Sequence, residues 1–253
     1  MLSKAEFAAL VLDNKYIKQV PTIKQAEFLI HDELECGFGG SAGPGKSSAL
    51  LMAALMYVEF PEYNAILFRK TYRDLALPGA IMDRSYEWLF DTDAKWNQIE
   101  KRWEFPSGAR LQFGYLDAAN DHYRYQSAEF VFIGIDEATQ IPENQYRYMF
   151  SRLRRSDKST IPLRFRIATN PGNIGHEFIK GRFISLTNDE LKKENRFWLP
   201  ARVTDNPHFD LKSYRESLKQ LDPITRAQLE DGNWDISLSA GMFKREYFKL
   251  VDD

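Results

Sequence analysis

Cysteines, membrane-length apolar runs and metal-ligand groupings are scarce or missing in this sequence of 253 residues. Its one cysteine, Cys36, cannot form an internal disulfide and suits a reducing compartment. No apolar run approaches the about 20 residues of a membrane span, and the N-terminus lacks a secretory signal, so no membrane partner is expected. No His, Cys or acidic grouping has zinc-ligand spacing, and no G-x-S-x-G motif suggests a nucleophilic serine.

Charge is nearly balanced along the whole chain, at a net −2, but it is unevenly distributed. Between residues 147 and 166 there are seven basic residues against one acid, Asp157. A solvated helix and loop, a surface for a phosphate backbone, and a subunit contact would each produce such a stretch. The charge pattern leaves these alternatives open.

A phosphate-loop motif is the strongest signal present, because residues 40–47 match G-x-x-x-x-G-K-[ST] at every fixed position. A buried strand is predicted over residues 34–38 and a helix over 48–57, so the loop joins strand to helix. Backbone N–H groups then converge on phosphates, Lys46 reaches the β and γ phosphates, and the Ser47 hydroxyl ligates Mg²⁺. The residues expected to hold the nucleotide here are Gly40, Ser41, Ala42, Gly43, Pro44, Gly45, Lys46, Ser47 and Ser48.

Gln25 lies upstream of this loop, in a helix that follows a proline turn at Pro21. A glutamine amide carries both a donor and an acceptor and can pair with the edge of adenine. A surface glutamine explains the residue equally well when it is taken alone. Its position before a phosphate loop favours adenine contact.

Two acids end a second apolar run at residues 130–137, which predicts a buried central strand. Asp136 is then placed to hold Mg²⁺, directly or through water, and Glu137 to polarise an attacking water. A nucleoside kinase would instead hand the phosphate to a bound alcohol. The acid pair favours hydrolysis.

Thr169 and Asn170 follow a third predicted strand, residues 163–168. Small polar side chains beside the carboxylate strand can bond the γ-phosphate or the attacking water, and so report which nucleotide is bound. A strand-ending turn is the alternative, since Asn-Pro favours one. A further strand over 64–68 ends in the basic residues Arg69 and Lys70.

The remaining elements complete an α/β fold. We expect an amphipathic helix over residues 3–19, a hairpin over 103–113, loops beyond Phe183, and helices over 211–221 and 223–230. Residues 1–198 would form the ATPase core with its N-terminal arm. Residues 199–253 would form a small helical lid and linker.

Taken in order, these motifs resemble the ATPase domain of the large subunit of tailed-phage terminases, the motors that package DNA. The resemblance also includes residues 124–129, His176, and the Leu229 to Asp235 stretch. It implies an additional-strand, RecA-like P-loop ATPase fold with a mostly parallel sheet, and Thr169-Asn170 as a coupling motif. It also implies ATP and Mg²⁺ as cofactors.

The implied partners are double-stranded DNA, the portal and procapsid, the small terminase subunit, and further copies in a ring. These meet in the host cytoplasm rather than in the mature virion. In such proteins a nuclease domain of ribonuclease H type follows the ATPase. The sequence up to Asp253 does not include this nuclease domain, so we expect an ATPase fragment that does not cleave DNA.

The chain departs from the family pattern at Ala42, where many terminases have an arginine inside the phosphate loop. A charge-stabilising arginine must then come from elsewhere. Arg124 is the candidate, donated across a subunit boundary, because its stretch resembles one that holds such an arginine in related motors. A surface loop arginine is the alternative.

Two other functions share some of these motifs. A helicase-like ATPase would ordinarily need a second similar core, for which the chain has no room. A nucleotide-gated assembly module would use ATP to order a subunit contact, with incidental turnover. A terminase motor is the preferred hypothesis.

Overall fold

An eight-stranded sheet forms the centre of the protein in a computed structural model, which describes residues 1–207 and 210–236. The strand order is β3-β4-β5-β2-β6-β7-β1-β8, with every neighbouring pair from β5 to β8 parallel and an antiparallel edge at β3 and β4. The strands are β1 (Glu35–Gly40), β2 (Asn64–Arg69), β3 (Lys95–Asn97), β4 (Arg102–Glu104), β5 (Arg110–Tyr115), β6 (Phe132–Asp136), β7 (Arg164–Thr169) and β8 (Arg196–Ala201). The predicted mostly parallel sheet is confirmed.

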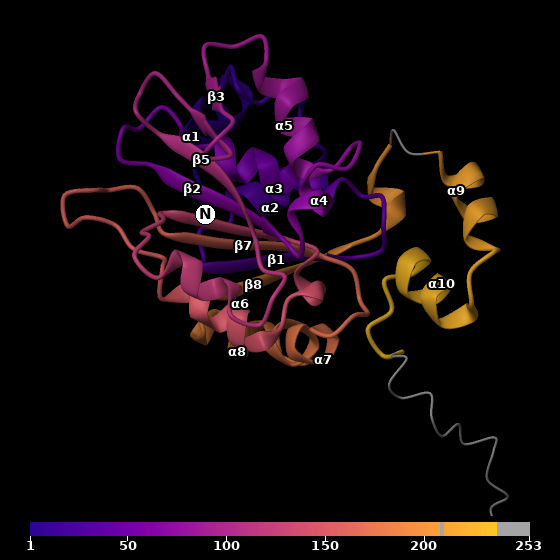
Figure 1. Cartoon of the computed structure of the whole chain (residues 1–253). Coiled ribbons are helices and arrows are strands. Elements are labelled where there is room, and N and C mark those ends of the chain that lie inside the picture. The colour runs from indigo at the N-terminus through magenta and orange to yellow at the C-terminus, as the bar shows by residue number, and fades with distance from the viewer. Residues whose placement is uncertain (208–209, 237–253) are drawn as a thin grey trace, which may run out of the picture.

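Helices cover both faces of this sheet (Figure 1). Figure 1 shows α2 to α5 above it, α6 to α8 below it, and α9 and α10 beside its edge. No helix in the described ranges has both the length and the apolar character to cross a bilayer. The α-helices are α1 (Lys4–Phe7), α2 (Ile23–Ile30), α3 (Lys46–Leu55), α4 (Tyr72–Leu75), α5 (Ile81–Leu89), α6 (Glu143–Phe150), α7 (His176–Ile179), α8 (Asn188–Lys193), α9 (Leu211–Leu218) and α10 (Pro223–Glu230). Short 3₁₀ or π turns are η1 (Ala8–Leu12), η2 (Asp121–Tyr125), η3 (Ala138–Gln140), η4 (Lys180–Ile184) and η5 (Val203–Asp205).

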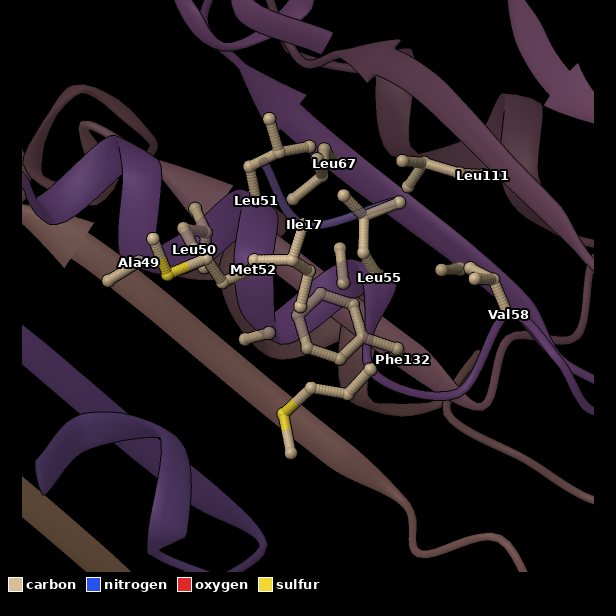
Figure 2. Close-up of a cluster of buried hydrophobic side chains, with 14 of the residues drawn as sticks. Ile17, Ala49, Leu50, Leu51, Met52, Leu55, Val58, Leu67, Leu111 and Phe132 are labelled. Atoms are coloured by element: carbon tan, nitrogen blue, oxygen red, sulfur yellow. The ribbon is translucent and has the colours of Figure 1, made fainter. Parts of the chain in front are cut away.

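Two apolar cores lie on the two faces of the sheet, because successive strand residues point to opposite sides. In β2, Leu67 belongs to the first core, and Ile66 and Phe68 to the second. The first core surrounds α3, whose residues from Ser48 to Leu55 are all buried. Figure 2 shows side chains of α3 packed with Leu67. Packing on every side holds α3, and therefore the start of that helix, in a fixed position.

Local patterns predicted most elements, with two corrections. The N-terminal helix ends at Leu12 rather than at residue 19. There the amide of the buried Asn14 donates to the backbone oxygens of Leu10 and Leu55, so the side chain competes with a continuing helix. The loops expected beyond Phe183 contain α8 and the edge strand β8. β8 pairs with β1 as far as Ala201, so the proposed domain boundary at residue 198 falls inside a strand.

The basic stretch at residues 147–166 is partly interior. Arg164 and Arg166 in β7 are only 2% and 0% exposed, and their guanidinium groups donate to backbone oxygens at the end of α2 and after it, including those of Leu29 and His31. Arg147 and Arg154 are exposed but form ion pairs with Glu143 and Glu129. Arg164 and Arg166 therefore cannot form part of a DNA-contacting surface.

Candidate nucleotide-binding site

The phosphate loop, which joins β1 to α3, lines a cleft of about 480 Å³. Its backbone requires glycine: Gly43 and Gly45 have φ of +91° and +84°, a region that L-residues rarely adopt. A Cβ on Gly45 would also lie 2.5 Å from the Gln25 amide nitrogen. Residues 42–48 all line the cleft. Gly40 and Ser41 lie behind it, where the Ser41 N–H donates to the backbone oxygen of Ala201 over 2.9 Å.

Lys46 is buried at the start of α3, and in this state it contacts protein rather than projecting into solvent. Its Nζ donates to the backbone oxygen of Ser41 over 2.5 Å and to Oδ1 of Asn170 over 2.6 Å. Burial lowers the pKa of the ammonium to about 8, against the opposing effect of Glu137 and Asp136. Both hydrogen-bond acceptors of this ammonium are neutral oxygens, and bound phosphates would instead place negative charge beside it.

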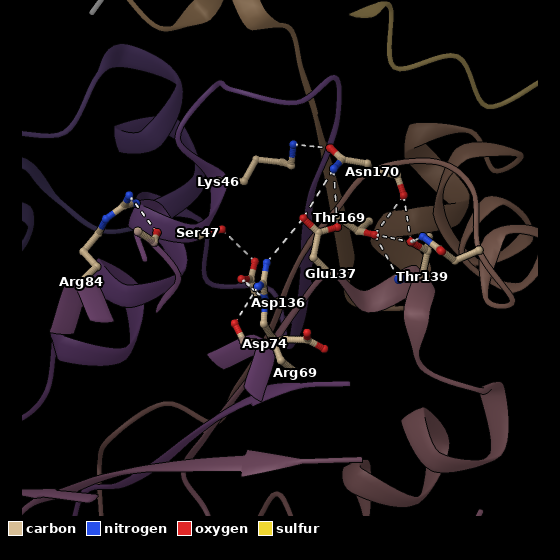
Figure 3. Close-up of polar contacts among 12 residues, drawn as sticks. Lys46, Ser47, Arg69, Asp74, Arg84, Asp136, Glu137, Thr139, Thr169 and Asn170 are labelled. Atoms are coloured by element: carbon tan, nitrogen blue, oxygen red, sulfur yellow. Dashed lines mark hydrogen bonds and ion pairs between the residues drawn. The ribbon is translucent and has the colours of Figure 1, made fainter. Parts of the chain in front are cut away.

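Asp136 lies beside Ser47, as the metal-site prediction requires (Figure 3). Ser47 Oγ donates to Asp136 Oδ1 over 2.9 Å, and Arg69 Nε donates to Asp136 Oδ2 over 2.9 Å. The described residues contain no group of three or more His, Cys, Asp or Glu side chains that could hold a metal alone. Mg²⁺ fits such a site, since it commonly binds one or two carboxylates together with substrate phosphates.

Glu137 has a backbone conformation that is unusual for its residue type, with φ +53° and ψ +50°. Such strain at a non-glycine residue costs roughly 1 to 2 kcal/mol and is concentrated at functional sites. The conformation leaves the carboxylate facing the cleft, 3.5 Å from the amide of Asn170. Burial and the neighbouring Asp136 raise the pKa of Glu137, while Lys46 and Arg69 lower it.

Asn170 lines the cleft and contacts both Lys46 and Glu137, whereas Thr169 lies behind it. Thr169 is buried; its Oγ1 accepts from the Thr139 N–H over 3.0 Å and lies 3.0 Å from Thr139 Oγ1. Thr139 in turn bonds the backbone oxygen of Asn170. The Thr169 side chain therefore braces the turn that presents Asn170.

Gln25 is placed at the cleft, but its amide already has partners. Nε2 donates to the backbone oxygen of Gly45 over 2.9 Å, and Oε1 accepts from the Thr22 N–H over 2.8 Å. The residue thus caps α2 and supports the phosphate loop. Gln19, which the sequence analysis did not select, lines the same cleft. Adenine contact by Gln25 stays a prediction.

Arg124 does not line this cleft. It lies on η2, where its guanidinium pairs with Asp121 at 3.1 Å, contacts the Tyr115 hydroxyl, and has 52% of its side chain exposed. His176 is buried, with its ring nitrogens near the Gly172 N–H and the Trp234 backbone oxygen, so it packs inside the fold.

Two further features of the cleft were missed in the sequence. Arg69 was recognised only as a strand end, yet it bonds Asp136. Helix α5 forms part of the cleft lining through Arg84, Glu87 and Trp88. Nothing local distinguishes these three residues from others of an amphipathic helix, so only the packing of α5 near α3 places them there.

Residues from the stretches 202–207 and 210–236 contact the phosphate loop. Asn206 Nδ2 donates to the Gly43 backbone oxygen, and the Ala42 N–H donates to that of Leu229, each over 2.8 Å. Helix α10 ends at Glu230 as predicted, and Gly232 follows with φ +64°. A Cβ on Gly232 would lie 2.5 Å from the Ser41 nitrogen, so this close approach requires glycine.

Solved structures of phage large terminases share this fold. The large terminase of the thermophilic bacteriophage D6E has 16% identity and a TM-score of 0.67 over 90% of this chain and 57% of that one. The same protein in complex with ATP-gamma-S has 16% identity and a TM-score of 0.62, over 92% and 53%. The large terminase ATPase domain of Thermus phage P74-26 has 14% identity and a TM-score of 0.58, over 92% and 98%.

The chain thus spans 57% and 53% of the two D6E chains. No curated protein matches it significantly. Its fold is the RecA-like P-loop fold of terminase ATPase domains. A family model described as terminase large subunit, T4likevirus-type, N-terminal, matches residues 38–250, and the chain therefore belongs to the family of phage terminase large subunits.

Proposed function

We propose that this chain hydrolyses ATP to drive double-stranded viral DNA into a procapsid. The observation that supports this most is convergence: Lys46, the acid pair at 136–137, and Asn170 lie together although they follow three different strands. The carboxyl ends of parallel strands are where open α/β sheets bind ligands. The D6E large terminase, which shares the fold, has been solved with ATP-gamma-S and with ADP.

Each residue has a role that its position permits. Lys46 would leave Ser41 and Asn170 to contact the β and γ phosphates, and Glu137 would accept a proton from the attacking water. Ser47 and Asp136 would hold Mg²⁺, which neutralises charge on the phosphates. Asn170, no longer bonded to Lys46, would sense the γ-phosphate. Its shift would be transmitted through Thr169 to the turn behind it. Gln25 would contact adenine.

The proposed lid begins after Ala201 rather than at residue 199, because β8 pairs with β1 in the central sheet as far as that residue. The bonds of Asn206 and Leu229 to the phosphate loop would pass its movement to this segment. The part of the lid expected over residues 208–209 and 237–253 lies outside the described residues.

The partners of the whole motor are likewise proposals: DNA, the portal and procapsid, the small subunit, and a ring of further copies, acting in the host cytoplasm. Mixing the chain with portal, procapsid and DNA should raise its ATPase rate, and DNA should become nuclease-protected as ATP is consumed. Turnover that unwinds DNA without procapsid would favour a helicase. ATP-dependent assembly without DNA movement would favour a gated module.

Arg124 is proposed as an arginine donated to a neighbouring copy, since it is half exposed and absent from its own cleft. Arg124→Ala should reduce the ATPase rate of the assembled ring by about 10³-fold, because an arginine supplied in trans contributes about 10³ to 10⁵ in related NTPases. Steady-state ATPase assays with and without portal check this. The variant's basal rate as an isolated chain should match wild type, and full activity in the ring would contradict the assignment.

A further inference from the structure

Helix α5 contributes one basic and one acidic side chain, Arg84 and Glu87, to the wall of the nucleotide cleft. Arg84, in the first turn of α5, lines the cleft beside the start of α3. Its Nη1 donates to the Ser48 hydroxyl, and its Nη2 donates to the backbone oxygen of Gly79 over 3.2 Å. These contacts aim the guanidinium at the start of α3, where phosphates are bound in such loops.

Among residues 1–207 and 210–236, Arg84 forms no ion pair with Glu87 or any other acid, whereas Arg69 pairs with Asp136. The nearby Asp83 carboxylate instead caps the Gly79 N–H over 2.7 Å. A partly buried cation without a counter-charge is unfavourable, and an anionic ligand in the cleft would supply one. Both partners of Arg84 are neutral oxygens, so a phosphate would be the stronger acceptor.

The position of Arg84 indicates which end of the triphosphate it would contact. Figure 3 shows Arg84 on the other side of the start of α3 from Asp136 and Glu137. Lysine and magnesium in a phosphate loop act on the β and γ phosphates. Arg84 bonds Ser48, one residue beyond the metal-binding hydroxyl of Ser47, and so lies toward the opposite end.

We propose that Arg84 binds the α-phosphate end of the nucleotide, exchanging its bond to Ser48 for one to phosphate. This inference rests on the proposed nucleotide binding and adds a residue to it. Such an arginine holds ATP and ADP alike, because both contain the α-phosphate. It therefore acts on affinity and not on the chemical step.

The test compares Arg84→Ala and Arg84→Gln with wild type, using ADP and a non-hydrolysable ATP analogue in calorimetric titrations with Mg²⁺. Each variant should bind both nucleotides about 10- to 100-fold more weakly, by similar factors, since a hydrogen bond to a charged group is lost. The ATPase rate at saturating ATP should stay within about twofold. Arg84→Gln can keep a donor near Ser48, so it provides the test if Arg84→Ala is unfolded.

Arg73→Gln is the matched control, because Arg73 is an exposed arginine on α4 outside the cleft. Weakening confined to the ATP analogue, or a fall in saturated rate, would overturn the proposal and place Arg84 at the γ-phosphate. Unchanged affinity for both nucleotides would also overturn it. A wild-type chain that binds nucleotide but moves no DNA would defeat the motor proposal and leave this comparison valid; one that binds none would defeat both.

Discussion

Glu137→Gln is expected to lower the ATPase rate by about 10²- to 10⁴-fold while leaving ATP binding intact, the range that general-base catalysis contributes. The glutamine amide keeps the size of the side chain but cannot take a proton from water. Binding should persist because Lys46 and Ser47 are unchanged. Single-turnover hydrolysis and nucleotide titration measure the two properties separately.

The pH dependence provides a second measurement of the same group. Burial and Asp136 raise the pKa of Glu137 above its usual 4.5. Below this raised pKa, Glu137 is protonated and cannot act as a base. As the pH is lowered, kcat/KM should therefore begin to fall at a higher pH than it would with an ordinary carboxylate. Glu59→Gln, at an exposed site outside the cleft, is the control. Hydrolysis retained by Glu137→Gln would remove the base assignment.

Much of the site could be predicted from the sequence because buried parallel strands produce unbroken apolar runs, and the residues that follow them meet at one sheet edge. The runs at β6 and β7 indicated where Asp136 and Asn170 would emerge. The glycine spacing indicated the loop, since positive φ at Gly43 and Gly45 is a local requirement. For these residues, local sequence carries the tertiary information.

The missed features depend on long-range packing instead. β8 contains Pro200, a residue that central strands exclude, and it is tolerated because β8 is the edge of the sheet. Arg164 and Arg166 have the composition of a solvated surface, yet carbonyl groups near the end of α2 satisfy them in the interior. Arg84 could be assigned only once α5 was placed against the cleft.

Lys46→Met is expected to weaken ATP binding by about 10²-fold or more, because it removes charge-assisted bonds to two phosphates. The same substitution should raise the free energy of unfolding of the nucleotide-free protein. Burial lowers the pKa of Lys46 from 10.5 to about 8. Between those pH values the lysine is therefore protonated in the unfolded state but largely neutral in the folded state. The charged lysine thereby reduces the stability of the nucleotide-free protein, by on the order of 3 kcal/mol at neutral pH before the loss of its two hydrogen bonds is subtracted.

Free wild-type protein should therefore melt below Lys46→Met near pH 7, and the difference should shrink as pH rises from about 8 through 10.5, where the lysine loses its proton in both states. Adding Mg²⁺ and ATP should reverse the order, since only wild type then gains the binding free energy. Thermal melts across this pH range, with and without nucleotide, test both statements, with Lys192→Met on exposed α8 as control. A variant that melts below wild type without nucleotide at pH 7 would mean that Lys46 stabilises the empty site, and phosphate binding would not be needed to balance its charge.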